Sequence, residues 1–266
     1  MNPRRAFAIV LRIFFLMRGS FTRIFPLFAW AAIDIILWGF ITRYLDTVQS
    51  NFNFVSTMLG AVLLWDFFTR AMFGISTSFF EDVWSRNFLN LFATPLRLSE
   101  YIGGLVVASM MTSFIGLVVM LTLAALVFGL WIFSFGAVVI VILLGLFLFG
   151  IAFGIFAIGI VLRLGPAAEW FIWPMPAVLA PIAAVFYPVA VLPIWLQPLA
   201  RAIPASYLFE TLRAIVKGGT VPADSLWIGC TLSVVYVFLA FWFFRVQYYH
   251  AVRTGLVARY SAETLS

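Results

Sequence analysis

The sequence predicts an all-α membrane protein, a single domain over residues 1–266 with six transmembrane helices. Hydrophobic residues make up 65% of the chain and charged residues only 10%, and the mean hydropathy is +1.12. A water-soluble domain of this size could not carry that composition on its surface, so lipid must surround most of it. The apolar runs, such as residues 114–128 and 138–161, are continuous, whereas the strands of a membrane barrel alternate lipid-facing and lumen-facing residues.

Six apolar segments are long enough to span a bilayer, which takes about 20 helical residues. They lie near residues 24–42, 54–76, 101–129, 135–162, 171–194 and 225–244. Six spans place both termini on one side of the membrane.

The charges between the spans predict which side this is. With the termini cytoplasmic, most of the 16 basic residues fall in cytoplasmic segments, namely Arg4, Arg5, Arg12, Arg18, Arg23, Arg86, Arg97, Arg163, Arg245, Arg253 and Arg259. The outer segments then hold only Arg43, Arg201, Arg213 and Lys217. Because positively charged loops stay in the cytoplasm, we expect a multi-pass protein of the cell (inner) membrane with both termini cytoplasmic.

The N-terminal segment, residues 1–23, is expected to form an interfacial helix. Between residues 4 and 18, arginines alternate with phenylalanines and leucines, which is typical of a basic amphipathic helix lying in the inner interface. Its simplest role is anchoring. The following apolar stretch is long enough to span, so we do not expect a cleaved signal peptide. The basic residues are dispersed along the polar segments, so the net charge of +6 indicates contact with membrane lipids and no nucleic-acid partner.

Residues 79–96 are expected to form a cytoplasmic amphipathic helix between the second and third spans. Apolar residues recur there at steps of three and four, at Phe80, Val83, Trp84, Phe88, Leu91 and Phe92. Proline disfavours helical geometry in the residue before it, so the helix should end at Thr94-Pro95. Such a helix either docks a soluble subunit or lies on the membrane without a partner. The candidate docking residues are Glu81, Asp82, Trp84, Arg86, Asn87, Asn90, Thr94 and Pro95.

Residues 186–222 are too rich in proline and polar residues for another span. Irregular backbone at membrane depth needs protein or water around it, so we expect an outer hairpin of short re-entrant helices, with a plain outer loop as the alternative. Its candidate gate residues are Phe186, Tyr187, Pro188, Pro193, Tyr207, Glu210 and Arg213.

Three charged residues lie inside predicted spans. Asp34 is in the first span, while Asp66 and Arg70 in the second are one helical turn apart and could pair. Intramembrane charges are costly and face the protein interior or a water-filled path. These three therefore act either as a proton relay or substrate contact, or as a structural ion pair. Gly150 and Gly154 form a GxxxG pair that allows helices to pack closely, within or between protomers.

Motifs for catalysis are absent from the sequence. There is no GxxxxGK[ST] phosphate loop and no HExxH, and the single Cys230 and single His250 provide neither a disulfide nor a clustered metal site. We therefore expect no enzyme activity in this chain. Uphill transport would draw on an ion gradient or on a separate ATPase subunit.

Two segments carry a resemblance to a known family. The first is Arg86-Asn87-Phe88-Leu89-Asn90-Leu91-Phe92-Ala93-Thr94-Pro95-Leu96, followed by Glu100; the second runs from Phe186-Tyr187-Pro188 through Leu192-Pro193 and Pro204-Ala205-Ser206-Tyr207 to Leu212-Arg213. With the order of the helices, they resemble the membrane subunits of ABC-2 type exporters over nearly the whole chain. Many members carry Gly-Thr-x-Glu ahead of the Thr-Pro, where this chain has Arg86-Asn87-Phe88-Leu89.

The resemblance implies a permease that pairs as a homodimer, or with a close homologue, and binds two copies of a nucleotide-binding ATPase subunit. This chain would bind no cofactor, and ATP and Mg would lie on the partner. Glu81 to Asn90 would enter a cleft of the ATPase, and Tyr187 to Arg213 would form part of the external gate. The expected function is ATP-driven export of an amphipathic, lipid-linked or glycan substrate. Two alternatives stay open: an ion-coupled carrier or channel using Asp34, Asp66 and Arg70, and a membrane scaffold that recruits a cytoplasmic partner.

Overall fold

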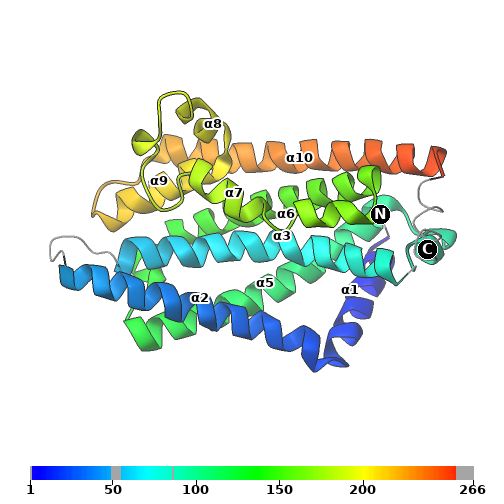
Figure 1. Cartoon of the computed structure of the whole chain (residues 1–266), viewed down its shortest axis with the longest axis horizontal. Coiled ribbons are helices and arrows are strands. Elements are labelled where there is room, and N and C mark those ends of the chain that lie inside the picture. Colours follow the sequence, from blue (N-terminus) through cyan, green and yellow to red (C-terminus); the bar gives the residue numbers. More distant parts are fainter. Residues whose placement is uncertain (1, 49–54, 86, 256–266) are drawn as a thin grey trace.

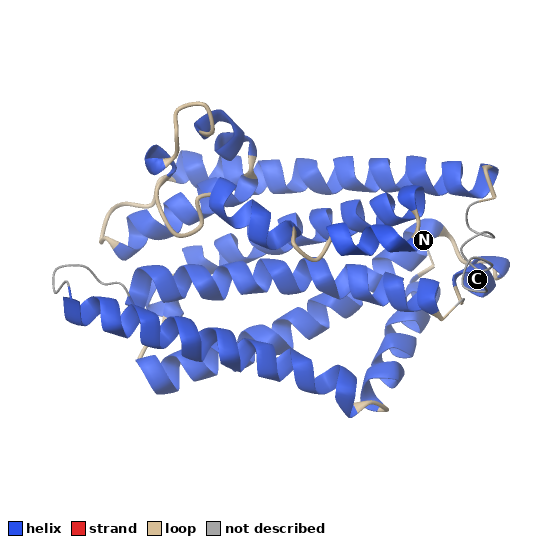
Figure 2. Ribbon diagram, in the orientation of Figure 1, coloured by secondary structure: helices blue, strands red, loops and turns tan. Residues whose placement is uncertain are grey.

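A computed structural model describes residues 2–48, 55–85 and 87–255, and within these ranges all regular elements are helices. Five of them are long and apolar enough to cross a membrane and run along a common bundle (Figures 1 and 2). They are α2 (Phe21–Val48), α3 (Gly60–Trp84, preceded by η1, Val55–Leu59), α5 (Leu98–Phe128), α6 (Val138–Leu164, preceded by η2, Ile132–Phe135) and α10 (Ala223–Arg253). The all-α class and the multi-pass apolar character are therefore confirmed.

Helices α3 and α6 form the centre of the bundle. About two thirds of the apolar stretch of each is buried, 67% in α3 and 61% in α6, against 19% in α2 and 17% in α10. A Cβ atom on Gly150 would lie 2.7 Å from the Ala71 side chain, and one on Gly154 would lie 2.8 Å from the Met72 carbonyl oxygen. The predicted GxxxG pair thus brings α6 against α3 within one chain. The apolar outer faces of α2 and α10 suit lipid.

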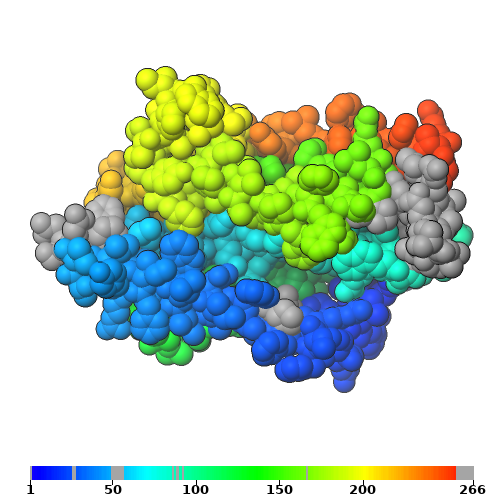
Figure 3. All heavy atoms as spheres, in the orientation of Figure 1, coloured from blue at the N-terminus to red at the C-terminus, as the bar shows by residue number. Residues whose placement is uncertain are grey.

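The expected span at residues 171–194 is wrong as one continuous helix. The chain after α6 is divided into η3 (Pro166–Phe171), α7 (Met175–Ile182), η4 (Val189–Val191) and α8 (Gln197–Ala202), before α9 (Pro204–Val216) leads to α10. Prolines stand at the breaks, because each lacks the backbone N–H that a continuing helix needs: Pro174 directly precedes α7, Pro181 lies in its last turn, and Pro188 directly precedes η4. This segment returns from the end of α6 toward the opposite end of the bundle (Figure 1), where its later part protrudes (Figure 3).

Helix α1 (Pro3–Arg18) matches the predicted N-terminal helix. The Asn2 side chain accepts a hydrogen bond from the Arg4 N–H at 3.1 Å and so caps the first turn, and Pro3 suits the first helical position. Ile9 and Val10 are buried, while Phe7, Phe14 and Phe15 are exposed. The helix is therefore amphipathic, as its sequence predicts.

The start of α1 and the end of α10 lie at the same end of the bundle (Figure 1). We call this the basic end, because the arginines of α1, the start of α2, the start of α5 and the ends of α6 and α10 gather there. They are Arg4, Arg5, Arg12, Arg18, Arg23, Arg97, Arg163 and Arg253. The opposite end holds Arg43, Arg201, Arg213 and Lys217 and is called the α9 end.

Candidate functional site

The connection between α3 and α5 lies at the basic end and differs from the single amphipathic helix that the sequence predicts. Helix α3 continues through Trp84, and a separate short helix, α4 (Phe88–Ala93), follows. Glu81 and Asp82 therefore belong to the last turn of a spanning helix. Thr94 is extended, with ψ at 164°, so α4 ends before Pro95 as predicted.

Asp82 is a buried joint between three helices and not part of an exposed docking surface. Its side chain forms an ion pair with Arg12 of α1, and the Tyr101 hydroxyl of α5 donates a hydrogen bond to its carboxylate at 2.7 Å. Only 2% of Asp82 is exposed. Burial by itself lowers the pKa of Arg12, but the hydrogen bond and charge of Asp82 outweigh burial and raise that pKa overall. The prediction of Asp82 as a docking residue is thus corrected, because its charge is used inside the protein.

Glu100 makes a second joint, at the start of α5. Its carboxylate accepts hydrogen bonds from the backbone N–H of Asn2 at 2.6 Å and of Arg97 at 3.0 Å. The Arg5 guanidinium lies 3.6 Å from it and also donates to the Pro95 carbonyl oxygen. The N-terminus of α1 is thereby bound both to Pro95, just after α4, and to Glu100, in the first turn of α5. The sequence marked Glu100 only as part of a motif, and its partners come from a distant helix.

The polar and aromatic side chains that remain exposed around α4 form what we call the α4 surface, made of Trp84, Asn90, Thr94 and Pro95. Trp84 is 53% exposed. Asn87 is half-buried, and Glu81 is half-buried in an ion pair with Arg23 at 3.5 Å. Arg86, a further predicted docking residue, lies outside the described residues. The α4 surface is thus a small exposed element between the ends of α3 and α5, and ion pairs tie those ends to α1 and α2.

Asp66 and Arg70 pair as their spacing predicts, and residues of α2 and α5 lie beside this pair. Arg70 forms an ion pair with Asp66, four residues before it on α3. The charge of Arg70 also acts on Asp34 of α2. Gly116 of α5 leaves room for Arg70, since a Cβ there would lie 2.9 Å from Arg70 Cδ. Gly116 was not among the predicted site residues; it shares one face of α5 with Ser113 and Ser109, three and seven residues before it.

Two predicted gate residues of α9, Glu210 and Arg213, hold the segment 184–189 in place. Arg213 of α9 donates to the carbonyl oxygens of Ala184 and Val185, both at 3.0 Å, and Glu210 accepts from the Val189 N–H at 2.8 Å. Glu210 and Arg213 pair at 3.3 Å. Burial lowers the pKa of Arg213, and Glu210 partly opposes this. These residues act as a clamp on residues 184–189, which includes Ala184 at a left-handed φ of 51°.

The other predicted gate residues mostly pack inside the hairpin. Phe186 stacks on Trp38 of α2 with ring centroids 5.4 Å apart, and the Tyr187 hydroxyl donates to the Pro181 carbonyl oxygen at 2.8 Å. Pro188 and Tyr207 are half-buried, whereas Pro193 is exposed. Two large hydrophobic residues that follow Pro193, Ile194 and Trp195, are 86% and 77% exposed and were not among the predicted ones. Their hydrophobicity alone did not distinguish them from core residues.

Among the described residues, no group of three His, Cys, Asp or Glu side chains could hold a metal ion. A scan against protein-family models finds no match to the chain. A search of curated proteins finds none either. The function must therefore be inferred from the geometry of the basic end and of the intramembrane charges.

Proposed function

We propose that this chain is the permease subunit of an ATP-driven ABC-2 type exporter that moves an amphipathic, lipid-linked or glycan substrate outward. The observation that supports this most is the α4 surface, an exposed element between two spanning helices at the basic end. On this proposal the basic end is cytoplasmic, in agreement with the preference of positive loops for that side. ATP would be hydrolysed, with Mg, by a separate nucleotide-binding subunit present in two copies.

The joints around α4 suit the transmission of force. The Arg12–Asp82 and Arg5–Glu100 pairs tie the ends of α3 and α5 that flank α4 to α1, and the Arg23–Glu81 pair ties the end of α3 to α2. A partner that pushes on α4 would thus move the ends of α3 and α5 together with α1, since a packed network deforms as a unit. A second permease copy would cover part of the apolar outer helices.

The test is a pull-down of the tagged protein from its native membrane, followed by an ATPase assay of the eluate. We expect an ATPase subunit to accompany the wild-type chain and to be lost or uncoupled in a Trp84→Ala/Arg86→Glu variant. Trp227→Ala is the matched control, because Trp227 is also exposed but lies at the start of α10, at the α9 end. Absence of any ATPase from the wild-type eluate in several mild detergents contradicts the proposal, as does equal loss in the control.

A second candidate function is ion-coupled transport through Asp34, Asp66 and Arg70, supported by their convergence at the α2, α3 and α5 interface. It predicts proton-dependent transport by the chain alone, lost in Asp66→Asn. A scaffold role instead predicts that the ATPase rate of a bound partner does not respond to changes at Trp84.

A further inference from the structure

Asp34 adjoins, on the same helix, the residues of α2 that line an apolar groove. We propose that Asp34, Asp66, Arg70 and Ser113 form a binding site for the ammonium head of an amphipathic alkylammonium cation, whose apolar part lies in this groove. This deepens the proposed function by naming the class of exported substrate, and the claim that the cation is exported rests on that function.

The charge of the cluster favours a cation. Asp66 and Arg70 neutralise one another in their ion pair, with side-chain exposures of only 14% and 11%. Asp34, half-buried on α2, then leaves the cluster with an excess negative charge when it is ionised. Such a charge at membrane depth is costly unless an opposite charge compensates it. One monovalent cation beside Asp34 supplies that compensation.

Ser113 provides independent support for a ligand. It is 1% exposed, and within the described part of the chain its hydroxyl has no hydrogen-bond partner. It stands on α5 between Ser109, whose hydroxyl donates to the Ala71 carbonyl oxygen at 2.8 Å, and Gly116, which faces Arg70. Ser113 shares this face and is therefore directed at the same part of α3. A buried hydroxyl without a partner is unfavourable, and an ammonium N–H is a suitable donor to it.

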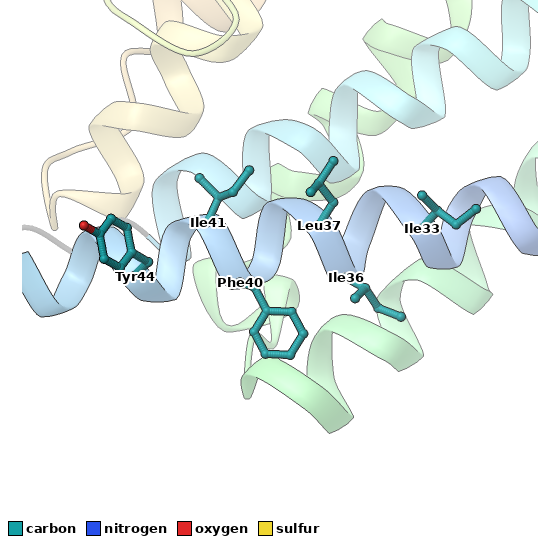
Figure 4. Close-up of a pocket in the computed structure, with 6 residues that line it drawn as sticks. All are labelled: Ile33, Ile36, Leu37, Phe40, Ile41 and Tyr44. Atoms are coloured by element: carbon teal, nitrogen blue, oxygen red, sulfur yellow. The ribbon is translucent and has the colours of Figure 1, made fainter.

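The groove suits the apolar part of the ligand. It has a volume of about 590 Å³ and is lined by Ile33, Ile36, Leu37, Phe40, Ile41 and Tyr44 (Figure 4). Ile33 precedes Asp34 and Leu37 lies one helical turn beyond it, so the carboxylate stands at the edge of the groove. Sites for drug-sized ligands have volumes of roughly 300–1,000 Å³ and combine apolar walls with a few polar groups. A negative charge beside an apolar wall favours an amphipathic cation over a neutral lipid chain as the ligand.

The test compares two probes on the purified chain in nanodiscs of zwitterionic lipid. Monodansylcadaverine carries one ammonium group and a fluorescent apolar ring system, and its N-acetyl derivative is neutral. Fluorescence anisotropy, corrected for empty nanodiscs, gives both affinities. We expect the cation to bind wild type about tenfold more tightly than the neutral compound, since a charge-assisted contact is lost on acetylation. Equal affinities overturn the proposal without recourse to any variant.

Variants then locate the site. Asp34→Asn should weaken cation binding by about tenfold and leave binding of the neutral compound unchanged, and Ser113→Ala should weaken cation binding by about threefold. Asp46→Asn, farther along the same helix, is the matched control and should bind the cation like wild type. Unchanged binding in Asp34→Asn, or an equal loss in Asp46→Asn, contradicts the assignment.

This result is independent of the ATPase test, because no partner is present. If the chain binds the cation specifically but no ATPase co-purifies with it, the binding site is supported and the exporter function is contradicted. If an ATPase co-purifies with the chain but the chain does not bind the cation specifically, the exporter function is supported and the binding site is contradicted.

Discussion

Replacing Asp82 by asparagine should weaken the attachment of α1 to the bundle and make α1 open more often. The Asp82 carboxylate is almost fully buried, and its partner Arg12 keeps 27% of its side chain exposed. Removing one member of a fully buried ion pair costs roughly 3–5 kcal/mol, because the other charge is left uncompensated. Since Arg12 retains contact with solvent, we expect a cost of about 2–3 kcal/mol. The amide can still accept the Tyr101 hydrogen bond, so the loss falls on the contact with α1.

Hydrogen exchange measures this opening. Each factor of ten in the opening equilibrium corresponds to about 1.4 kcal/mol. A cost near the middle of the expected range should therefore make the amides of α1 exchange roughly 50- to 100-fold faster. The amides of Ile9 and Val10 report it, because both residues are buried against the bundle. Peptides from α6 in the same sample provide the internal reference.

Two controls make the result decisive. Arg18→Gln removes an exposed positive charge from the same helix and should leave exchange of α1 unchanged. The double variant Arg12→Gln/Asp82→Asn should exchange no faster than the faster single variant, because partners in one ion pair are not additive. Unchanged exchange in Asp82→Asn, or additive effects in the double variant, would refute the assignment of Asp82 as the joint between α1 and α3.

Two further changes test the packing of the bundle and the clamp on the outer hairpin. Gly150→Ala should destabilise the protein by about 1–3 kcal/mol in detergent unfolding, because the added Cβ meets α3 backbone and side-chain atoms; Gly60→Ala, with no atom within 4 Å of the new Cβ, should not. Arg213→Met should make residues 184–196 more susceptible to protease, because two carbonyl oxygens lose their donor at a cost of about 1–3 kcal/mol each. Arg201→Met, an exposed arginine on α8, is the control; equal cleavage in both variants would contradict the clamp.

Hydropathy located the long helices well where each turn is apolar, as in α5 and α6, whereas α10 continues past the predicted end at residue 244 through a polar stretch to Arg253. It placed the end of α3 too early, because the helix continues past Ser76 to include Asp82. That carboxylate is tolerated in a buried position only because Arg12, 70 residues earlier, pairs with it. A local window contains no information about such a partner. The same omission made Asp82 look available for docking.

The failed prediction of one span at residues 171–194 has a different cause. Hydropathy measures side chains, whereas helix continuity depends on backbone donors, which the prolines of this segment lack. Among the charged residues, the Asp66–Arg70 pair was predictable because its four-residue spacing is local to one helix. The approach of Asp34 and Gly116 to Arg70 depends on how three helices pack, which the spacing does not specify.

The exporter proposal is tested most directly by asking what touches the α4 surface in the native membrane. A photo-crosslinking amino acid at position 90 would replace an exposed asparagine on α4, and one at position 220, at the α9 end, serves as the control. The account predicts that position 90, and not position 220, captures a protein that mass spectrometry identifies as carrying a GxxxxGK[ST] phosphate loop. Capture of no such protein at position 90, or its equal capture at position 220, would contradict the account.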